Sequence, residues 1–176
     1  QQLPACWQNN SLADIGGQWQ FVDSSYIIYD DIGQQSDIYF EAPSAHNGFA
    51  VADPQLYNVY DTLNIELVSR KFNFTGHDSV SVSFTHYFLR LGVSASGTFY
   101  YSRDNANTWT PVKVWENTTD NGDLFNKDLS AELAGETDVF FKWEFFSDWS
   151  VINEQFWAVD SIRVATSPNT PPQVVN

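Results

Sequence analysis

The feature that most constrains the fold is an alternation of apolar and polar residues over positions 80–88. Valine, phenylalanine and histidine occupy every second position, and serine, threonine and tyrosine lie between them. A period of two predicts a β-strand with one buried face. Residues 139–146 repeat the pattern, with Lys142 and Glu144 on the polar face, and 156–164 form a third long strand. These three segments predict a protein built from sheets.

Shorter strands are predicted along the rest of the chain. They lie at 26–29, 37–40, 48–52, 64–68, 97–102 and 112–115, and turn signals such as Gly16-Gly17 and Asn121-Gly122 separate them. Only residues 128–133 have the character of a helical turn. Many short strands with frequent turns predict an all-β, antiparallel β-sandwich, and 176 residues fit a single domain.

The two ends of the chain differ in character from its centre. We expect the domain to span residues 1–166, and the polar, proline-rich residues 167–176 to form a linker or tail. The first residues lack the basic and apolar regions of a signal peptide, so we expect a piece of a longer protein. The chain has no run of eighteen apolar residues, which predicts no membrane insertion. Cys6 is the single cysteine, and we expect its thiol to be buried.

The charge balance restricts the partners. The chain has 22 acidic and 8 basic residues and a formal net charge of −14. Nucleic acids and anionic membranes bind mainly through lysine and arginine, so both are disfavoured as partners. Cations, neutral sugars and basic peptides remain compatible with this charge. The acidity either serves solubility alone or reflects a calcium site.

The sequence contains no recognisable catalytic motif. Its three histidines lie in different segments, and no G-x-S-x-G, H-E-x-x-H or P-loop motif occurs. His86 lies on the apolar face of its strand, which predicts a satisfied core histidine. Glu41, Glu144 and Glu154 would be glycosidase carboxylates only by default, because 22 acidic residues make some pair inevitable. We therefore predict a domain that is not an enzyme.

Seven segments occur in an order that suggests a family. They are residues 3–7, Trp19, 48–53, 61–69, 80–88, 101–109 and 156–164. Together they resemble the jelly-roll superfamily of MAM-like, choice-of-anchor J and cleaved-adhesin domains of bacterial secreted proteins. Two departures are Asn105-Ala106 in place of a Gly-Gly pair, and Ser161 in place of a second aspartate. The resemblance implies a jelly-roll sandwich and a secreted or cell-surface location.

The same resemblance implies a structural calcium ion that ties a loop to the last strand. Asp160 matches the first aspartate of the closing motif, and Asp53 ends another predicted strand. Asp23 is a candidate ligand from a loop. Calcium prefers several oxygen ligands, and this chain lacks the spacing of an EF-hand. The alternative is that Asp160 accepts backbone N–H hydrogen bonds and binds no ion.

The seven tryptophans divide into core residues and candidate ligand-binding residues. We expect Trp7, Trp19, Trp143 and Trp157 in the core, and Trp109 packed against its hairpin turn. Trp149 is predicted to stack on a sugar ring, with Asp148 and Asn153 bonding its hydroxyls, and Trp115 is a second aromatic candidate. The alternative is that Trp149 plugs one end of the sandwich. Tyr57, Tyr60, Tyr100 and Tyr101 form another aromatic group.

The function that these observations favour is binding without catalysis. We expect an accessory module, for carbohydrate, in a larger secreted or cell-surface protein, with neighbouring domains in the same chain. A module for protein adhesion or self-association is the first alternative. A polysaccharide hydrolase or lyase of sandwich fold is the second, since sandwiches host many unrelated activities.

Overall fold

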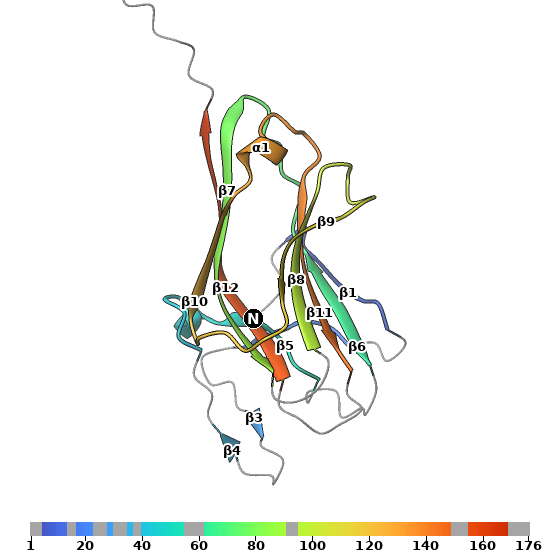
Figure 1. Ribbon diagram of the computed structural model, residues 1–176, viewed down its shortest axis with the longest axis vertical. Coiled ribbons are helices and arrows are strands. Elements are labelled where there is room, and N and C mark those ends of the chain that lie inside the picture. The colour runs from blue at the N-terminus through green and yellow to red at the C-terminus, as the bar shows by residue number, and fades with distance from the viewer. Residues whose placement is uncertain are drawn as a thin grey trace, which may run out of the picture.

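The computed structural model describes residues 5–13, 17–22, 28–29, 35–36, 40–54, 62–90, 95–148 and 155–168. Two five-stranded sheets, all of whose pairings are antiparallel, face each other as layers (Figure 1). Sheet A has the order β1 (Gln8–Ser11), β6 (Leu63–Val68), β11 (Phe140–Ser147), β8 (Ala95–Ser102), β9 (Thr110–Trp115). Sheet B has the order β10 (Asp123–Asp128), β7 (His77–Arg90), β12 (Gln155–Pro168), β5 (Phe49–Ala52), β2 (Gln20–Val22). The predicted all-β, single-domain jelly-roll sandwich is confirmed.

Four small elements complete the described chain. Strands β3 (Ile28–Tyr29) and β4 (Gln35–Ser36) pair with each other beyond one end of the sandwich (Figure 1). A 3₁₀ turn, η1 (Ala45–Asn47), precedes β5, and a single turn of helix, α1 (Ser130–Leu133), follows β10. The predicted helical turn at 128–133 is confirmed.

The long alternating segments form the centre of the sandwich. Strands β7 and β12 pair over their lengths, from Arg90 opposite Gln155 to His77 opposite Pro168. The last pairing carries β12 two residues past the expected domain end at residue 166, and residues 169–176 lie outside the described part. Strands β1, β2, β4 and β10 were not predicted, and residues 37–39 of the strand expected at 37–40 lie outside the described part. β10 keeps only Phe125 partly buried, so its sequence shows no apolar stripe.

The core between the sheets is mostly aromatic. Its largest fully buried side chains are Trp19, Trp143, Trp157, Phe84, Phe88, Phe99, Phe141 and Phe145. Trp143 of sheet A meets Phe84 of sheet B with ring centroids 5.6 Å apart, and Trp7 stacks on Trp143 at 5.7 Å. Such pairs contribute roughly 0.5–1.5 kcal/mol each beyond the burial of their area. The core positions predicted for Trp19, Trp143 and Trp157 are confirmed, and Trp7 packs against this core from its border.

A glycine in sheet A lets the two sheets approach closely. Gly97 in β8 faces the Trp157 indole so closely that an added Cβ would lie 2.8 Å from a ring atom. Only glycine therefore fits where these two sheets meet.

Cys6 is exposed and its φ is +68°, so the expectation of a buried thiol is wrong. Among the described residues, no helix is long and apolar enough to cross a membrane.

Candidate functional site

The face of sheet A that points away from the core carries a concentrated group of polar and aromatic side chains. Because side chains alternate along a strand, the register decides which of them become neighbours. Lys142 of β11 lies opposite Tyr100 of β8, and Glu144 of β11 lies opposite Glu66 of β6. Asn10 of β1 lies opposite Glu66. With Trp109 these residues form what we call the outer-face cluster.

The ammonium group of Lys142 is the centre of this cluster. It lies 2.7 Å from Glu144 Oε2 and 3.3 Å from Glu66 Oε2. It also lies 4.4 Å from the ring centroid of Tyr100 and 5.0 Å from that of Trp109. Two carboxylates and two ring faces leave only 7 % of the lysine side chain exposed. Ion pairing and cation–π attraction together hold the lysine against the sheet.

Hydrogen bonds fix the two carboxylates. Asn10 Nδ2 donates to Glu66 Oε1 over 2.9 Å, and the Tyr100 hydroxyl donates to Glu144 Oε1 over a longer 3.4 Å. Burial and the adjacent Glu144 carboxylate raise the pKa of Tyr100, so its hydroxyl stays protonated and available as a donor. Two carboxylates and one ammonium group leave the cluster with one net negative charge.

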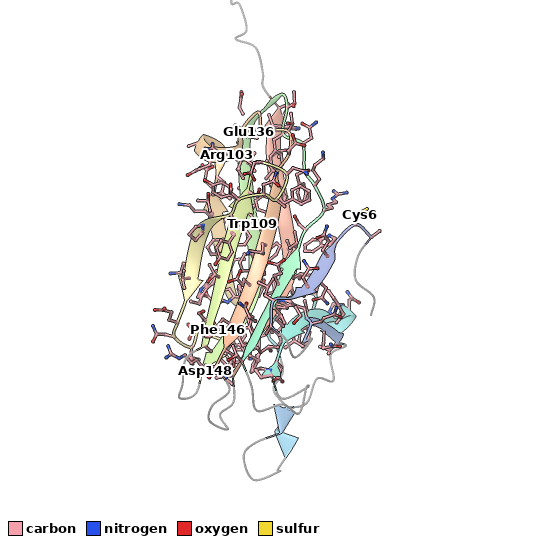
Figure 2. All side chains as sticks on the ribbon, turned by 90° about the vertical axis from the view of Figure 1, so that its right-hand side faces the viewer. Cys6, Arg103, Trp109, Glu136, Phe146 and Asp148 are labelled. Carbon is pink, nitrogen blue, oxygen red and sulfur yellow. The ribbon has the colours of Figure 1, made fainter. Side chains whose placement is uncertain are left out.

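The hairpin between β8 and β9 positions Trp109. The Asp104 carboxylate accepts hydrogen bonds from Thr108 Oγ1 at 2.6 Å, Thr108 N at 2.9 Å and Ser102 Oγ at 2.7 Å. These hydrogen bonds lower the pKa of Asp104 to about 2, and those from Thr108 have the largest effect. Asn105-Ala106 adopts φ values of +60° and +65°, the left-handed conformation that a Gly-Gly pair would adopt more easily. Trp109 lies over the middle of sheet A (Figure 2).

The outer face of sheet B differs because other residues cover it. Phe40, Ala45 and Phe49 form a second apolar cluster there with Leu89 and Phe156. Phe40 and Phe49 meet edge to face, with ring centroids 5.1 Å apart. This cluster covers the outer side of sheet B around β5 and the adjoining ends of β7 and β12, whereas the outer face of sheet A presents the polar and aromatic cluster.

The predicted ligand-binding residues do not form one site in the described part of the chain. Trp115 is 7 % exposed and points from β9 into the core, against Phe84 and Trp157. Asp148 is half-buried beyond the end of β11, near Phe146 at the lower end of sheet A (Figure 2). Trp149 and Asn153 lie outside the described residues, so their part in the prediction is not tested.

The two predicted calcium ligands in the described part of the chain lie far apart. Val159 of β12 pairs with Ala50 of β5, which places Asp160 beside Phe49. Asp53 lies four residues further along, roughly 13 Å away at the usual rise of a strand. One ion therefore cannot bind both carboxylates.

Two serine side chains lie next to the Asp160 carboxylate. Ser44 Oγ donates to Asp160 Oδ2 at 2.6 Å and lies 2.7 Å from Ser161 Oγ. The Ser44 hydroxyl thus partners this carboxylate and also contacts the Ser161 hydroxyl. Among the described residues, no three His, Cys, Asp or Glu side chains lie close enough to hold a metal ion together. Asp23 lies outside them, and the calcium ion stays a prediction.

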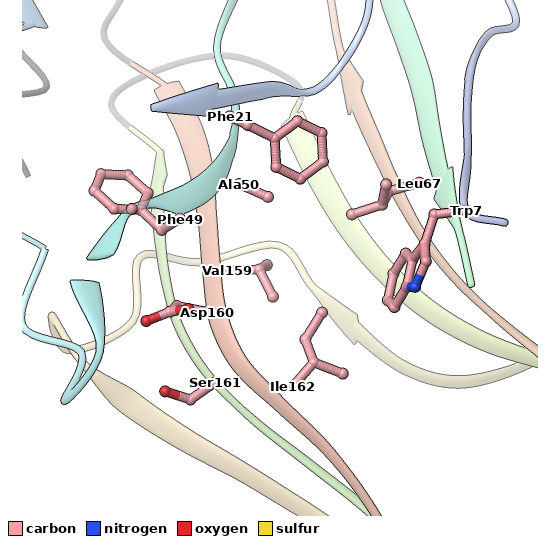
Figure 3. A pocket seen from close by; sticks show the side chains of 10 residues that line it. Trp7, Phe21, Phe49, Ala50, Leu67, Val159, Asp160, Ser161 and Ile162 are labelled. Atoms are coloured by element: carbon pink, nitrogen blue, oxygen red, sulfur yellow. The ribbon is translucent and has the colours of Figure 1, made fainter. Parts of the chain in front are cut away.

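A cavity of about 260 Å³ lies next to Asp160 (Figure 3). Both sheets line it with apolar side chains, including Trp7 and Leu67 from one and Phe21 and Ile162 from the other. Asp160 and Ser161 contribute its polar groups. Ser161 has a φ of +54° at the bulge of β12, so this departure from the family motif lies in a left-handed position.

Sequence reasoning found the outer-face cluster only in part. It placed Lys142 and Glu144 on the polar face of their strand and named Tyr100 as an exposed aromatic candidate. It did not single out Glu66 or Asn10. The polar position of Glu66 within an alternating strand was the available signal, but the pairing of β6 with β11 was needed to bring it to Lys142.

Comparisons with known proteins support the fold. No family model and no curated protein matches the chain. The structure resembles TmCBM61 in complex with β-1,4-galactotriose, with a TM-score of 0.54 and 10 % identity over 93 % of this chain and 90 % of that one. It also resembles an exo-β-agarase, with a TM-score of 0.50 and 10 % identity over 98 % of this chain and 24 % of that one. These likenesses show a shared sandwich fold. The resemblance to MAM-like domains is not confirmed.

Proposed function

We propose that this chain is a non-catalytic module that binds a neutral glycan on the outer face of sheet A. The observation that carries the proposal is the outer-face cluster. It combines two half-buried aromatic rings with an ammonium group, an amide and two carboxylates on one sheet face. Ligand sites typically join aromatic surface with a few fixed polar groups in this way.

The chemistry of a sugar fits these groups. A sugar ring has an apolar C–H face that can lie on the Tyr100 or Trp109 ring, and hydroxyl groups that both donate and accept hydrogen bonds. Glu66 and Glu144 supply acceptors and Asn10 supplies a donor, while the buried Lys142 ammonium group holds the two carboxylates in place. The negative charge of the cluster and the net charge of −14 repel anionic glycans, which favours a neutral ligand.

The arrangement of the two carboxylates favours binding over hydrolysis. Glycoside hydrolysis needs one carboxyl group that donates a proton and a second that is ionised. In such sites the two groups have different surroundings, which give them different pKa values. Glu66 and Glu144 share one partner, the Lys142 ammonium group. Neither is set apart as the proton donor.

The matched structures support an accessory role in a larger protein, which we propose to be secreted or at the cell surface. One of them is a carbohydrate-binding module of similar length, and in the exo-β-agarase the matched part is 24 % of the chain. A domain of this fold therefore occurs beside other domains in that protein. We include in the proposal a structural calcium ion at Asp160, with its remaining ligands from residues outside the described part.

Calorimetric titration with neutral polysaccharides, including a β-1,4-galactan, tests the proposal, with alginate as the anionic comparison. We expect binding of at least one neutral glycan and none of alginate. Tyr100→Ala and Trp109→Ala should each weaken binding at least about tenfold, equivalent to ~1.4 kcal/mol. Tyr87→Ala is the matched control, because Tyr87 is a half-buried strand tyrosine that packs on Phe156 in sheet B.

Two outcomes would count against this proposal. Binding that survives both substitutions in sheet A would place the ligand elsewhere on the molecule. An equal loss in Tyr87→Ala would show that a general loss of structure explains the effect. Circular dichroism of each variant distinguishes the second case from a local change at the site.

A further inference from the structure

A second cavity lies at the opposite border of the sandwich from Asp160. Strand β9 ends sheet A and β10 ends sheet B, and residues 116–122 connect the two strands across this edge (Figure 1). The cavity has a volume of about 460 Å³, within the range typical of small-molecule sites. Side chains of β7, β9, β10 and the connecting segment line it. We call it the edge cavity.

The wall of the edge cavity contains a buried polar group without a hydrogen-bond partner. His86 of β7 is fully buried, and neither ring nitrogen makes a hydrogen bond within the described part of the chain. Asp123 Oδ2 lies 3.5 Å from Nε2, which is too long for an ordinary hydrogen bond. An unpaired buried donor or acceptor costs about 1–3 kcal/mol, so such a group calls for an explanation. The expectation of a satisfied core histidine is therefore wrong in this respect.

The groups around the imidazole determine what it can bind. Burial lowers the pKa of His86 to about 4; the Asp123 carboxylate opposes this change and Lys113 adds to it. At neutral pH the ring therefore offers one N–H donor and one acceptor nitrogen. Asp123, whose side chain is 49 % exposed, adds acceptors beside it, and Lys113 adds a donor from β9. A hydroxyl group, which donates and accepts at once, matches this set.

Apolar side chains form part of the wall of the edge cavity, beside polar side chains of residues 116–119, Asp123 and Asn126. Val114 and Leu124 are 46 % and 64 % exposed and line the cavity, and they are two of the three exposed large apolar side chains in the described residues. Trp115 and Phe125 form the floor, with the Trp115 ring 4.7 Å from the imidazole centroid. Polar groups beside apolar side chains suit a ligand that has both hydroxyl groups and apolar faces.

We propose that the edge cavity binds one sugar residue of a neutral glycan, at a site separate from the outer-face cluster. This inference rests on the proposed function, glycan binding, but on different residues. The Asp123 side chain must rotate away from Nε2 for a sugar hydroxyl to reach His86, and its exposure leaves it free to do so. The hydroxyl then accepts from or donates to the imidazole and contacts Asp123.

Two other occupants fit this cavity less well. A divalent metal ion needs more ligands than His86 and Asp123, and no metal-binding group of three appears among the described side chains. An apolar side chain of a protein partner would suit Val114 and Leu124 but would leave His86 and Asp123 unpaired below it.

The test is an NMR titration of the whole chain with free galactose, glucose and mannose, observing the imidazole signals of the three histidines. We expect a saturable shift of the His86 signals with at least one of these sugars. His77 lies nine residues from His86 along β7, roughly 30 Å away at the usual rise of a strand, so its signals are the internal control. Asp123→Ala should abolish the shift at His86, and Trp109→Ala should leave it intact. Asp123 is an exposed edge residue, so its replacement should not prevent folding.

Each alternative outcome overturns the inference in a recognisable way. If none of the sugars moves the His86 signals, the edge cavity is not a sugar site. If Trp109→Ala abolishes the shift and Asp123→Ala does not, the sugar binds at the outer face and His86 responds indirectly. Neither result contradicts glycan binding by the outer-face cluster, which the polysaccharide titration tests separately.

Discussion

Replacing His86 by phenylalanine should make the protein less sensitive to acid. Phenylalanine keeps an aromatic ring against Phe84, Trp115 and Trp157, which surround the imidazole in the core. It removes both titratable nitrogen atoms of the imidazole ring. The comparison therefore isolates the cost of protonating a buried histidine, with the packing of the core nearly unchanged.

The size of the effect follows from the two pKa values of the histidine. The pKa is about 6.5 in the unfolded chain and about 4 in the folded protein, mainly because burial disfavours the cation. Between these pH values the unfolded chain binds a proton that the folded protein does not bind, so stability falls as the pH decreases. At pH 4.5 this linkage removes about 2.5 kcal/mol of the free energy of unfolding, close to the full difference of ~3 kcal/mol.

Urea unfolding at neutral pH and at pH 4.5 measures this difference. The wild type should lose more stability on acidification than His86→Phe, by about 2–3 kcal/mol. His46→Gln is the control for the loss of a histidine, because the His46 side chain is exposed. Other groups also titrate over this range, but they are common to all three proteins and cancel in the comparison.

The reasoning would be refuted by parallel pH profiles of the wild type and His86→Phe. That result would mean that His86 titrates alike in the folded and unfolded states, which a fully buried imidazole should not do. A steeper loss in the variant would also contradict the account, because it would require the histidine to stabilise the fold in its charged form.

Three further predictions concern the core, the hairpin and the metal. Gly97→Ala should lower the free energy of unfolding by roughly 1–3 kcal/mol in thermal unfolding, because the added Cβ meets the Trp157 indole. In the double variant, Trp157→Phe should relieve part of that cost. If the effects of the two substitutions simply add, the proposed clash between them is excluded. Asp104→Ala should weaken glycan binding in calorimetry, because it loosens the hairpin that carries Trp109; unchanged affinity would show that the hairpin needs no such support. A chelator should lower the melting temperature, and less so in Asp160→Ala; an unchanged wild-type melt removes calcium from the account.

The sequence predicted the sandwich because the burial pattern of its central strands is local. A strand such as β7 alternates between core and surface, and that period appears directly in consecutive residues. The strands that were missed are at sheet edges or next to them, and they lack a continuous buried stripe. β10 is the plainest example, since five of its six side chains are exposed.

The candidate site was harder to predict because it depends on pairing between distant segments. Glu66, Tyr100 and Lys142 come from three strands, and only the register β6–β11–β8 brings them together. Sequence alone identifies each as a polar-face residue and cannot choose its neighbours. Trp115 was predicted to bind a ligand, but the structure buries it in the core. Its position at the end of a short strand gave no sign that the ring points into the core.

The central claim is that glycan binds across the Tyr100 and Trp109 rings of sheet A. The most direct measurement is NMR detection of intermolecular NOEs between a bound neutral oligosaccharide and assigned aromatic protons of the protein. The account predicts NOEs from sugar ring protons to Tyr100 and Trp109. Contacts to Tyr87 and Phe156 on sheet B, with none on sheet A, would contradict it.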